Sequence, residues 1–261
     1  MNSTRRKLAI ATWGPPDEGN IFGKLMIDAG AALQWIDKTR AATGEKVTIT
    51  HMVGKAIALG LAKAPQINGR ITLGSYIPFD TVDVTFLVAL EDGADLAKAK
   101  IANLDKRPVA DIAAELRVKA DKLRKGQDDE FEKSKGVLRA LPTWLLRPIL
   151  WLTGWLTSSL GISLPALGLE AFPFGSCVVT SVGMLGIDEA FAPHTPFARV
   201  PLLVLVGAVK DTVVARDGVP VVRPMLTLTA TIDHRFVDGT QLATVAKTIR
   251  GVLENPDLLD K

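Results

Sequence analysis

The stretch PMLTLTATIDHRFVDGTQL, residues 224–242, changes from one hydrophobic period to another. In its first half, apolar residues alternate strictly with threonines, which predicts a half-buried β-strand that ends at Asp233. After Gly239 the apolar spacing becomes helical, so a helix is predicted to begin there. Its inward residues are expected to be Leu242, Val245, Ala246, Ile249 and Leu253. His234 and Asp238 therefore lie in a tight turn between a strand and a helix.

The turn allows two interpretations. A strand-to-helix turn exposes side chains at the edge of a sheet without disturbing the core, so His234 and Asp238 are candidate catalytic residues. Asp238 is also well placed to cap the following helix, because a carboxylate at this position accepts hydrogen bonds from free backbone N–H groups. His234 is then an ordinary turn residue. The spacing alone leaves both interpretations open.

The remaining pattern alternates strands with helices. Residues 47–50 read as a short strand followed by a helix that Pro65 closes, and Pro108 opens a second helix with one apolar stripe. Further strands are expected at 70–77, 81–90, 201–209, 212–215 and 219–223. Because neither an internal repeat nor a Ser/Gly linker appears, the prediction is one α/β domain over residues 1–261, a mixed sheet with helices packed on it.

Composition excludes several classes. The formal net charge is only +3 and the chain has one tyrosine, which argues against a nucleic-acid partner. A single cysteine, Cys177, cannot form an intrachain disulfide or a Cys-based zinc site and is expected to be a small buried residue. It indicates a reducing compartment, and the absence of a signal-peptide pattern favours the cytoplasm. His51 and His194 have no partners at ligand spacing, so no metal is expected.

Residues 127–174 differ from the rest of the chain. A polar stretch is followed by LPTWLLRPILWLTGWLTSSLGISLPALGLEAF, in which Arg147 and Glu170 are the only ionised side chains. Trp144, Pro148, Trp151 and Trp155 recur at helical spacing and predict an aromatic stripe on one helix face. Three interpretations stay open: burial within the protein or at a subunit contact, a position in a membrane interface, and a membrane span.

The turn also resembles a known family. DHRFVDG is similar to the catalytic turn of the dihydrolipoyl acyltransferases of 2-oxo acid dehydrogenase complexes, which share the fold of chloramphenicol acetyltransferase. Three other stretches resemble that family: GSCVVTSVGMLGI with Thr180, the helix that ends in Pro65 and Asn68, and the C-terminal VLENPDLL. The resemblance covers about two thirds of the chain.

The resemblance implies acyl transfer between coenzyme A and a thiol such as dihydrolipoamide. His234 is the implied base that deprotonates the thiol, Thr180 the implied donor to the oxyanion, and Asp238 is expected to order the turn through a charged partner. The site is implied to lie between subunits of a homotrimer, which in the family assembles further into a cage. Acyl-CoA is then a substrate, and a lipoyl-bearing protein acts in trans.

Some family features are missing from this sequence. No lipoyl domain, peripheral-subunit-binding domain or Thr-Pro-Val stretch is recognisable, and the Trp-rich segment at about 127–174 has no counterpart in the family. Because tryptophan suits the depth of a membrane interface, residues 138–170 are a candidate membrane-surface contact. The leading hypothesis is a stand-alone oligomeric acyltransferase. The alternative is a self-assembling scaffold or protein cage that has lost turnover.

Overall fold

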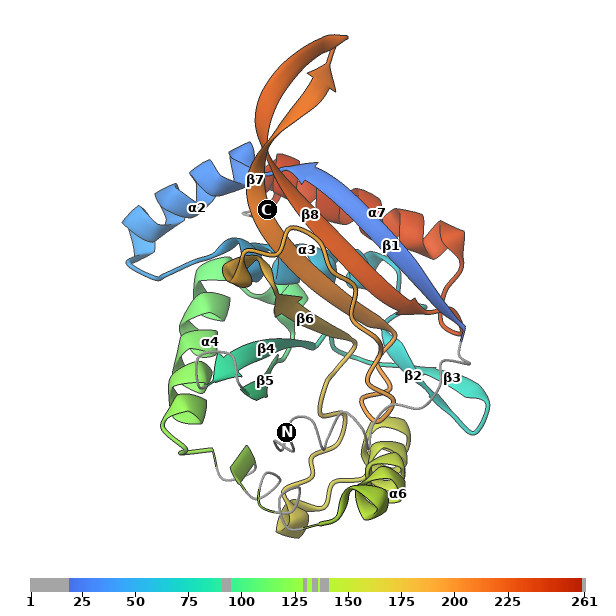
Figure 1. Ribbon diagram of the computed structural model, residues 1–261. Coiled ribbons are helices and arrows are strands. Elements are labelled where there is room, and N and C mark those ends of the chain that lie inside the picture. Colours follow the sequence, from blue (N-terminus) through green and yellow to red (C-terminus); the bar gives the residue numbers. More distant parts are fainter. Residues whose placement is uncertain (1–18, 91–94, 129–130, 133–135, 137–140, 260–261) are drawn as a thin grey trace.

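The computed structural model describes residues 19–90, 95–128, 131–132, 136 and 141–259 (Figure 1). A six-stranded sheet runs in the order β1-β8-β7-β6-β4-β5. β6 is parallel to both of its neighbours, whereas the other pairs are antiparallel, which confirms the predicted mixed sheet. Its strands are β1 (Asn20–Asp28), β4 (Val84–Leu90), β5 (Asp95–Ile101), β6 (Cys177–Ser181), β7 (Leu202–Arg216) and β8 (Val219–Asp233).

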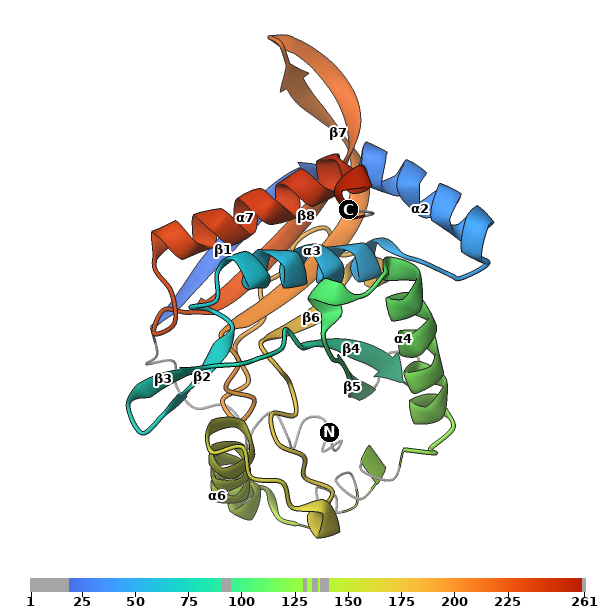
Figure 2. The same cartoon turned by 180° about the vertical axis from the view of Figure 1, so that it is seen from behind.

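Four helices lie on one face of this sheet, as the view from behind shows (Figure 2). They are α2 (Gly30–Thr43), α3 (Ile49–Lys63), α4 (Val109–Arg124) and α7 (Gly239–Glu254). The predicted α4 stripe is confirmed, since Val109, Ile112, Leu116, Ala120 and Leu123 are all buried. Val245, Ile249 and Leu253 of α7 are buried as well, so the helical period read after the HRFVD turn is correct.

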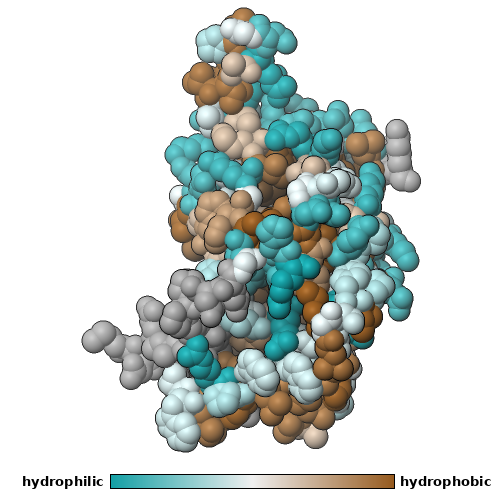
Figure 3. Space-filling view, turned by 90° about the vertical axis from the view of Figure 1, so that its right-hand side faces the viewer, coloured by the Kyte–Doolittle hydropathy of each residue, from teal (hydrophilic) through white to brown (hydrophobic). Residues whose placement is uncertain are grey.

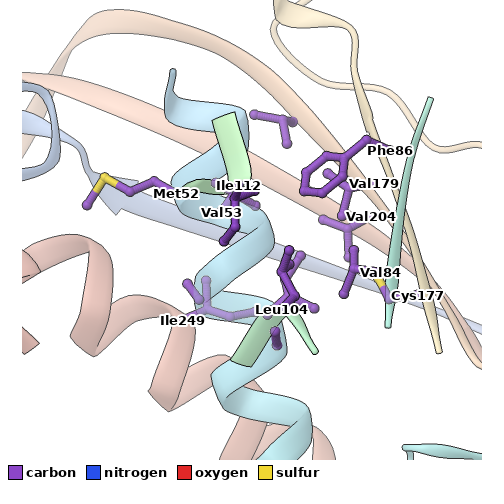
Figure 4. Packing of buried hydrophobic residues seen from close by; sticks show 14 of the residues in the cluster. Met52, Val53, Val84, Phe86, Leu104, Ile112, Cys177, Val179, Val204 and Ile249 are labelled. Carbon is purple, nitrogen blue, oxygen red and sulfur yellow. The ribbon is translucent and has the colours of Figure 1, made fainter. Parts of the chain in front are cut away.

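The main core lies between α3 and the sheet (Figure 4). Met52 and Val53 of α3 belong to the same cluster of buried residues as Phe86 on β4 and Val204 on β7. Cys177 on β6 is fully buried in this cluster, as predicted, and burial raises the pKa of its thiol. A buried, protonated thiol is neither a nucleophile nor a metal ligand.

The other face of the sheet is covered by irregular chain. Thr229 and Thr231 point to this face, and their hydroxyls donate to the carbonyl oxygens of Ala190 and Ala192. The alternation predicted for residues 225–233 is therefore confirmed, with leucines toward the helices and threonines toward the 186–200 loop.

The predicted short strand at residues 47–50 is wrong. Thr48 is extended and precedes α3, and its backbone N–H donates to Nδ1 of His51 at 3.1 Å. Burial, with a smaller contribution from Arg40, lowers the pKa of His51 to about 4. His51 thus acts as a neutral hydrogen-bond acceptor at the helix start.

The strand boundaries also differ from the prediction. Residues 70–77 form a hairpin of two strands, β2 (Gly69–Thr72) and β3 (Ser75–Pro78). The four segments predicted between residues 201 and 233 are two continuous strands, β7 and β8, with a bulge between Val206 and Val209. Their tip turns at Asp217 and Gly218, both at positive φ, and extends beyond the body of the protein (Figure 1). β1 and β5 were not predicted.

Gly54 on α3 sets how closely this helix approaches β4. A Cβ at this position would lie 2.7 Å from Cε1 of Phe86, which is far inside van der Waals contact. Gly54→Ala is therefore expected to lower the free energy of unfolding by about 1–3 kcal/mol through overpacking. Gly251→Ala on α7 is the control: it meets open space and should raise that free energy by up to about 1 kcal/mol through helix propensity. Equal effects of the two substitutions in chemical denaturation would contradict close packing of α3 on β4.

Candidate active site

Two backbone hydrogen bonds hold the turn after β8. The N–H of Asp233 donates to the carbonyl oxygen of Pro201 at 3.0 Å, and the N–H of His234 donates to that of Gly19 at 3.1 Å. Phe236 and Val237 are buried in the main core, whereas the His234 side chain is exposed. The two hydrogen bonds and the burial of Phe236 and Val237 thus fix the turn, which presents the imidazole at the end of the sheet.

Arg235 stabilises the same turn. Its Nε lies 2.9 Å from Oδ1 of Asp233 and its Nη2 lies 2.5 Å from Oδ2, a bidentate ion pair. The backbone N–H of Arg235 donates to the same carboxylate at 3.0 Å. These bonds restrict the backbone on both sides of His234.

Asp238 is the N-cap of α7. Its carboxylate accepts from the N–H of Thr240 at 3.0 Å, and its own N–H donates to Oε1 of Gln241 at 3.1 Å, which completes a capping box. Among the described residues, the Asp238 carboxylate makes no ion pair, and a backbone amide is its partner in place of the expected charged group. Within the described ranges, the His234 imidazole makes no hydrogen bond to Asp238 or to any other residue. Asp238 orders the turn through the helix start and not through the histidine.

Thr180 lies on β6, far from His234 of the same chain. Thr180 is opposite Leu205 on β7, and Leu205 is opposite Thr229 on β8. Thr229 precedes His234 by five residues (234 − 229 = 5), which is roughly 16 Å along a strand, and the two intervening strand spacings add about 10 Å sideways. One protomer therefore does not bring the two candidate residues together.

The Thr180 side chain faces away from the helices. Its neighbour two positions back, Val178, belongs to a second small cluster on the loop-covered face, and Val182 packs against that cluster. Because side chains alternate along a strand, Thr180 shares this face. It is only partly buried, so its hydroxyl can be reached.

The Trp-rich segment lies beside the turn. It forms α6 (Thr143–Gly154), a π-helical turn η3 (Trp155–Ser159) and a 3-10 turn η4 (Pro165–Leu167). The Ser158 hydroxyl donates to the carbonyl oxygen of Phe197 at 3.2 Å, and the Arg199 guanidinium donates to the Ser159 hydroxyl at 3.0 Å. Residues 197–201 lead directly to the Pro201 carbonyl that binds the turn after β8, so the segment lies next to the candidate site.

The predicted aromatic stripe is helical, but it is not buried in the protomer. Trp144 is 76% exposed and Trp151 is 61% exposed. Hydrophobic side chains gather at this end of the molecule (Figure 3). Burial within the chain is therefore excluded as an interpretation for these two residues. Over the described residues, no helix is long and apolar enough to cross a membrane.

Sequence reasoning missed two residues near the turn. The sequence indicates only that His194 is no metal ligand, and it gives Arg199 no role. Burial, followed by smaller opposing effects of Asp233 and Arg235, lowers the pKa of His194, which shows that this loop lies close to the turn. Their only sequence signal is proximity to Pro201. Among the described residues, no three His, Cys, Asp or Glu side chains gather as a metal site.

Residues 25–137 and 166–260 match the model of the 2-oxoacid dehydrogenases acyltransferase (catalytic domain) family. The gap in this match, residues 138–165, contains α6 and η3. Residues 138–165 are thus an addition to the family pattern, whereas residues 127–137 and 166–174 match the family, so the predicted insertion at 127–174 was too wide.

Two relatives illustrate the match. The chain is 26% identical over 212 residues to a dihydrolipoyllysine-residue acetyltransferase component of the chloroplastic pyruvate dehydrogenase complex of Arabidopsis thaliana, covering 80% of this chain and 36% of the relative. It is 24% identical over 237 residues to a Haemophilus influenzae dihydrolipoyllysine-residue succinyltransferase component of the 2-oxoglutarate dehydrogenase complex, covering 87% and 47%. The chain thus spans less than half the length of either relative.

Solved structures share the fold. The cubic core of a pyruvate dehydrogenase complex superposes with a TM-score of 0.71 at 19% identity, covering 98% of this chain and 89% of that one. Chloramphenicol acetyltransferase gives a TM-score of 0.52 at 12% identity, covering 97% and 96%. The predicted acyltransferase fold is confirmed.

Proposed function

The chain belongs to the 2-oxoacid dehydrogenases acyltransferase (catalytic domain) family, and from this we propose that it transfers an acyl group between coenzyme A and a thiol such as dihydrolipoamide. The observation that carries the proposal is the exposed His234 on a turn fixed by two backbone hydrogen bonds and an ion pair. A rigid turn keeps the imidazole in position as a base, although the imidazole makes no hydrogen bond to the described residues of its own protomer.

The chemistry follows from the groups present. A thiol with a pKa of about 8.5 is mostly protonated at neutral pH, and the thiolate is the nucleophile. His234 takes the thiol proton, and the new thiolate attacks the thioester carbonyl carbon to form a tetrahedral oxyanion. When this intermediate collapses, the C–S bond of the donor breaks, and the leaving thiolate recovers the proton from His234. The Thr180 hydroxyl donates to the oxyanion, a contribution of about 3 kcal/mol in comparable sites.

The arrangement requires more than one protomer. Since Thr180 and His234 are far apart in one chain, we propose at least a homotrimer in which His234 of one subunit meets Thr180 of its neighbour. The similarity to a structure described as a cubic core supports further assembly into a cage. A lipoyl-bearing protein supplied in trans delivers the second thiol. Neither metal nor nucleic acid takes part in the proposal.

His234→Ala is expected to lower kcat at least about 100-fold, because the general base is removed. Thr180→Val, which keeps the shape and removes the hydroxyl, is expected to lower kcat by about 100-fold. The measurement is formation of acetyl-dihydrolipoamide from acetyl-CoA and dihydrolipoamide, with Thr244→Val on α7 as the control. Wild-type rates in both site variants would favour the inactive scaffold.

A second contact is proposed for the Trp-rich segment: the surface of an anionic membrane, on the cytoplasmic side. Trp144, Arg147 and Trp151 are exposed at helical spacing on α6. Arg147 is the only ionised side chain between residues 141 and 169, so no acidic group there repels anionic lipid. Tryptophan favours the depth of the membrane interface, and a cation adds attraction to anionic headgroups.

The double substitution Trp144→Ser and Trp151→Ser is expected to weaken binding to phosphatidylcholine vesicles containing phosphatidylglycerol at least about tenfold, given the area that each indole loses from the interface. Vesicle co-sedimentation measures this, with Val118→Ser, an exposed apolar residue on α4, as the control. Unchanged vesicle binding with a reduced particle mass would assign the stripe to a subunit contact.

A further inference from the structure

Arg199 lies in the segment that pairs with the catalytic turn. Two residues later, the carbonyl oxygen of Pro201 accepts from the N–H of Asp233, next to His234. Ala198 and Val200 on either side of Arg199 are buried in the small cluster on the loop-covered face. Arg199 itself adopts a φ of 50°, the left-handed region that non-glycine residues rarely occupy. Packing of its neighbours therefore fixes where the arginine side chain begins.

The Arg199 guanidinium is partly buried, and no carboxylate of the described residues pairs with it. Its Nη1 donates to the Ser159 hydroxyl at 3.0 Å, and its central carbon lies 6.0 Å from the centre of the Trp151 ring. Its Nε is buried and makes no hydrogen bond. In the described part of the chain, no carboxylate lies within ion-pair distance of it. Taking a guanidinium partly out of water without a counter-charge is costly.

Arg235 differs in this respect. It is close enough for its charge, after the larger effect of burial, to lower the pKa of Arg199. However, Arg235 is already neutralised by the bidentate pair with Asp233. The positive charge beside the catalytic turn that still lacks a carboxylate is therefore that of Arg199.

The Trp-rich segment builds this environment. Ser159 and Trp151 both come from the residues that the family model does not match. Gly154 lies so close to Phe197 that a Cβ there would be 2.6 Å from the Phe197 carbonyl oxygen, so α6 fits tightly against the Arg199 segment. The added segment thus orients one cation next to the reaction centre.

We propose that Arg199 binds an anionic group of the acyl thioester substrate, either a carboxylate on the acyl chain or the 3′-phosphate of coenzyme A. A guanidinium matches the paired oxygens of both groups, and the exposed part of Arg199 can donate to them. The inference rests on the proposed function, since it takes the His234 turn as the reaction centre. It adds a residue that selects the donor.

The test compares three donors with the full-length oligomer: succinyl-CoA, acetyl-CoA and 3′-dephospho-acetyl-CoA. If Arg199 binds the acyl carboxylate, Arg199→Gln should raise KM for succinyl-CoA about 10- to 100-fold and leave KM for the acetyl donors unchanged. If it binds the phosphate, KM should rise for succinyl-CoA and acetyl-CoA but not for the dephospho donor. Arg199→Lys should recover part of the loss, and Arg124→Gln on α4 is the matched control.

Binding titrations of the same three ligands with their non-hydrolysable thioether analogues keep the inference separate from catalysis. Donor-selective loss of affinity in Arg199→Gln supports the inference even if the wild type shows no turnover, in which case only the proposed function fails. If Arg199→Gln leaves the affinity and KM for all three donors at the wild-type values, or changes all three by the same factor, the inference is overturned while the role of His234 stays intact. Ser159→Ala, which frees the guanidinium without removing it, should give a smaller change in the same direction.

Discussion

The register of β6, β7 and β8 is the constraint on which the rest of the site depends. Parallel pairing of β6 with β7 places Thr180 opposite Leu205. Antiparallel pairing of β7 with β8 places Leu205 opposite Thr229, so that His234 lies beyond the end of β8, far along the strand from Thr180. A shift of one residue would move Thr180 to the helix-covered face. Because this register is fixed by a core that includes Val179 and Val204, the distance between the two candidate residues cannot close within one protomer.

The turn and the added segment have different physical origins. The turn is held by backbone hydrogen bonds to residues 19 and 201 and by the capping box of α7, and it lies within residues 166–260, which match the family model. The Trp-rich segment is anchored by Gly154 and Ser158 against Phe197. It leaves Trp144 and Trp151 exposed, and it orients Arg199 through Ser159 and the Trp151 ring. One insertion thus supplies both a candidate outer contact and a candidate determinant of the substrate.

Local patterns predicted the turn well. Strict alternation before Asp233, the helical period after Gly239 and the Asp238 cap depend on neighbours in sequence, and all three are present. Periodicity also predicts that Trp144 and Trp151 share a helix face. It does not predict that this face points to solvent, because the buried side of the segment packs against Phe197, which lies far along the chain. The sequence pattern divides the long β7–β8 hairpin into four short strands, because charged residues and Pro224 interrupt its apolar runs. These residues are tolerated in the continuous strands because β1 ends opposite Met225 and the part of the hairpin beyond it is exposed to solvent. Arg199 belongs to no motif and emerged only from its three-dimensional neighbours.

Mixed oligomers test the central claim, that a second subunit completes the active site. His234→Ala and Thr180→Val protomers, each inactive alone, would be co-assembled in equal amounts and assayed for acyl transfer. A site formed by His234 of one subunit and Thr180 of the next is restored at roughly one interface in four, so activity should recover to about a quarter of the wild-type value. No recovery in mixed particles of wild-type mass would contradict the account.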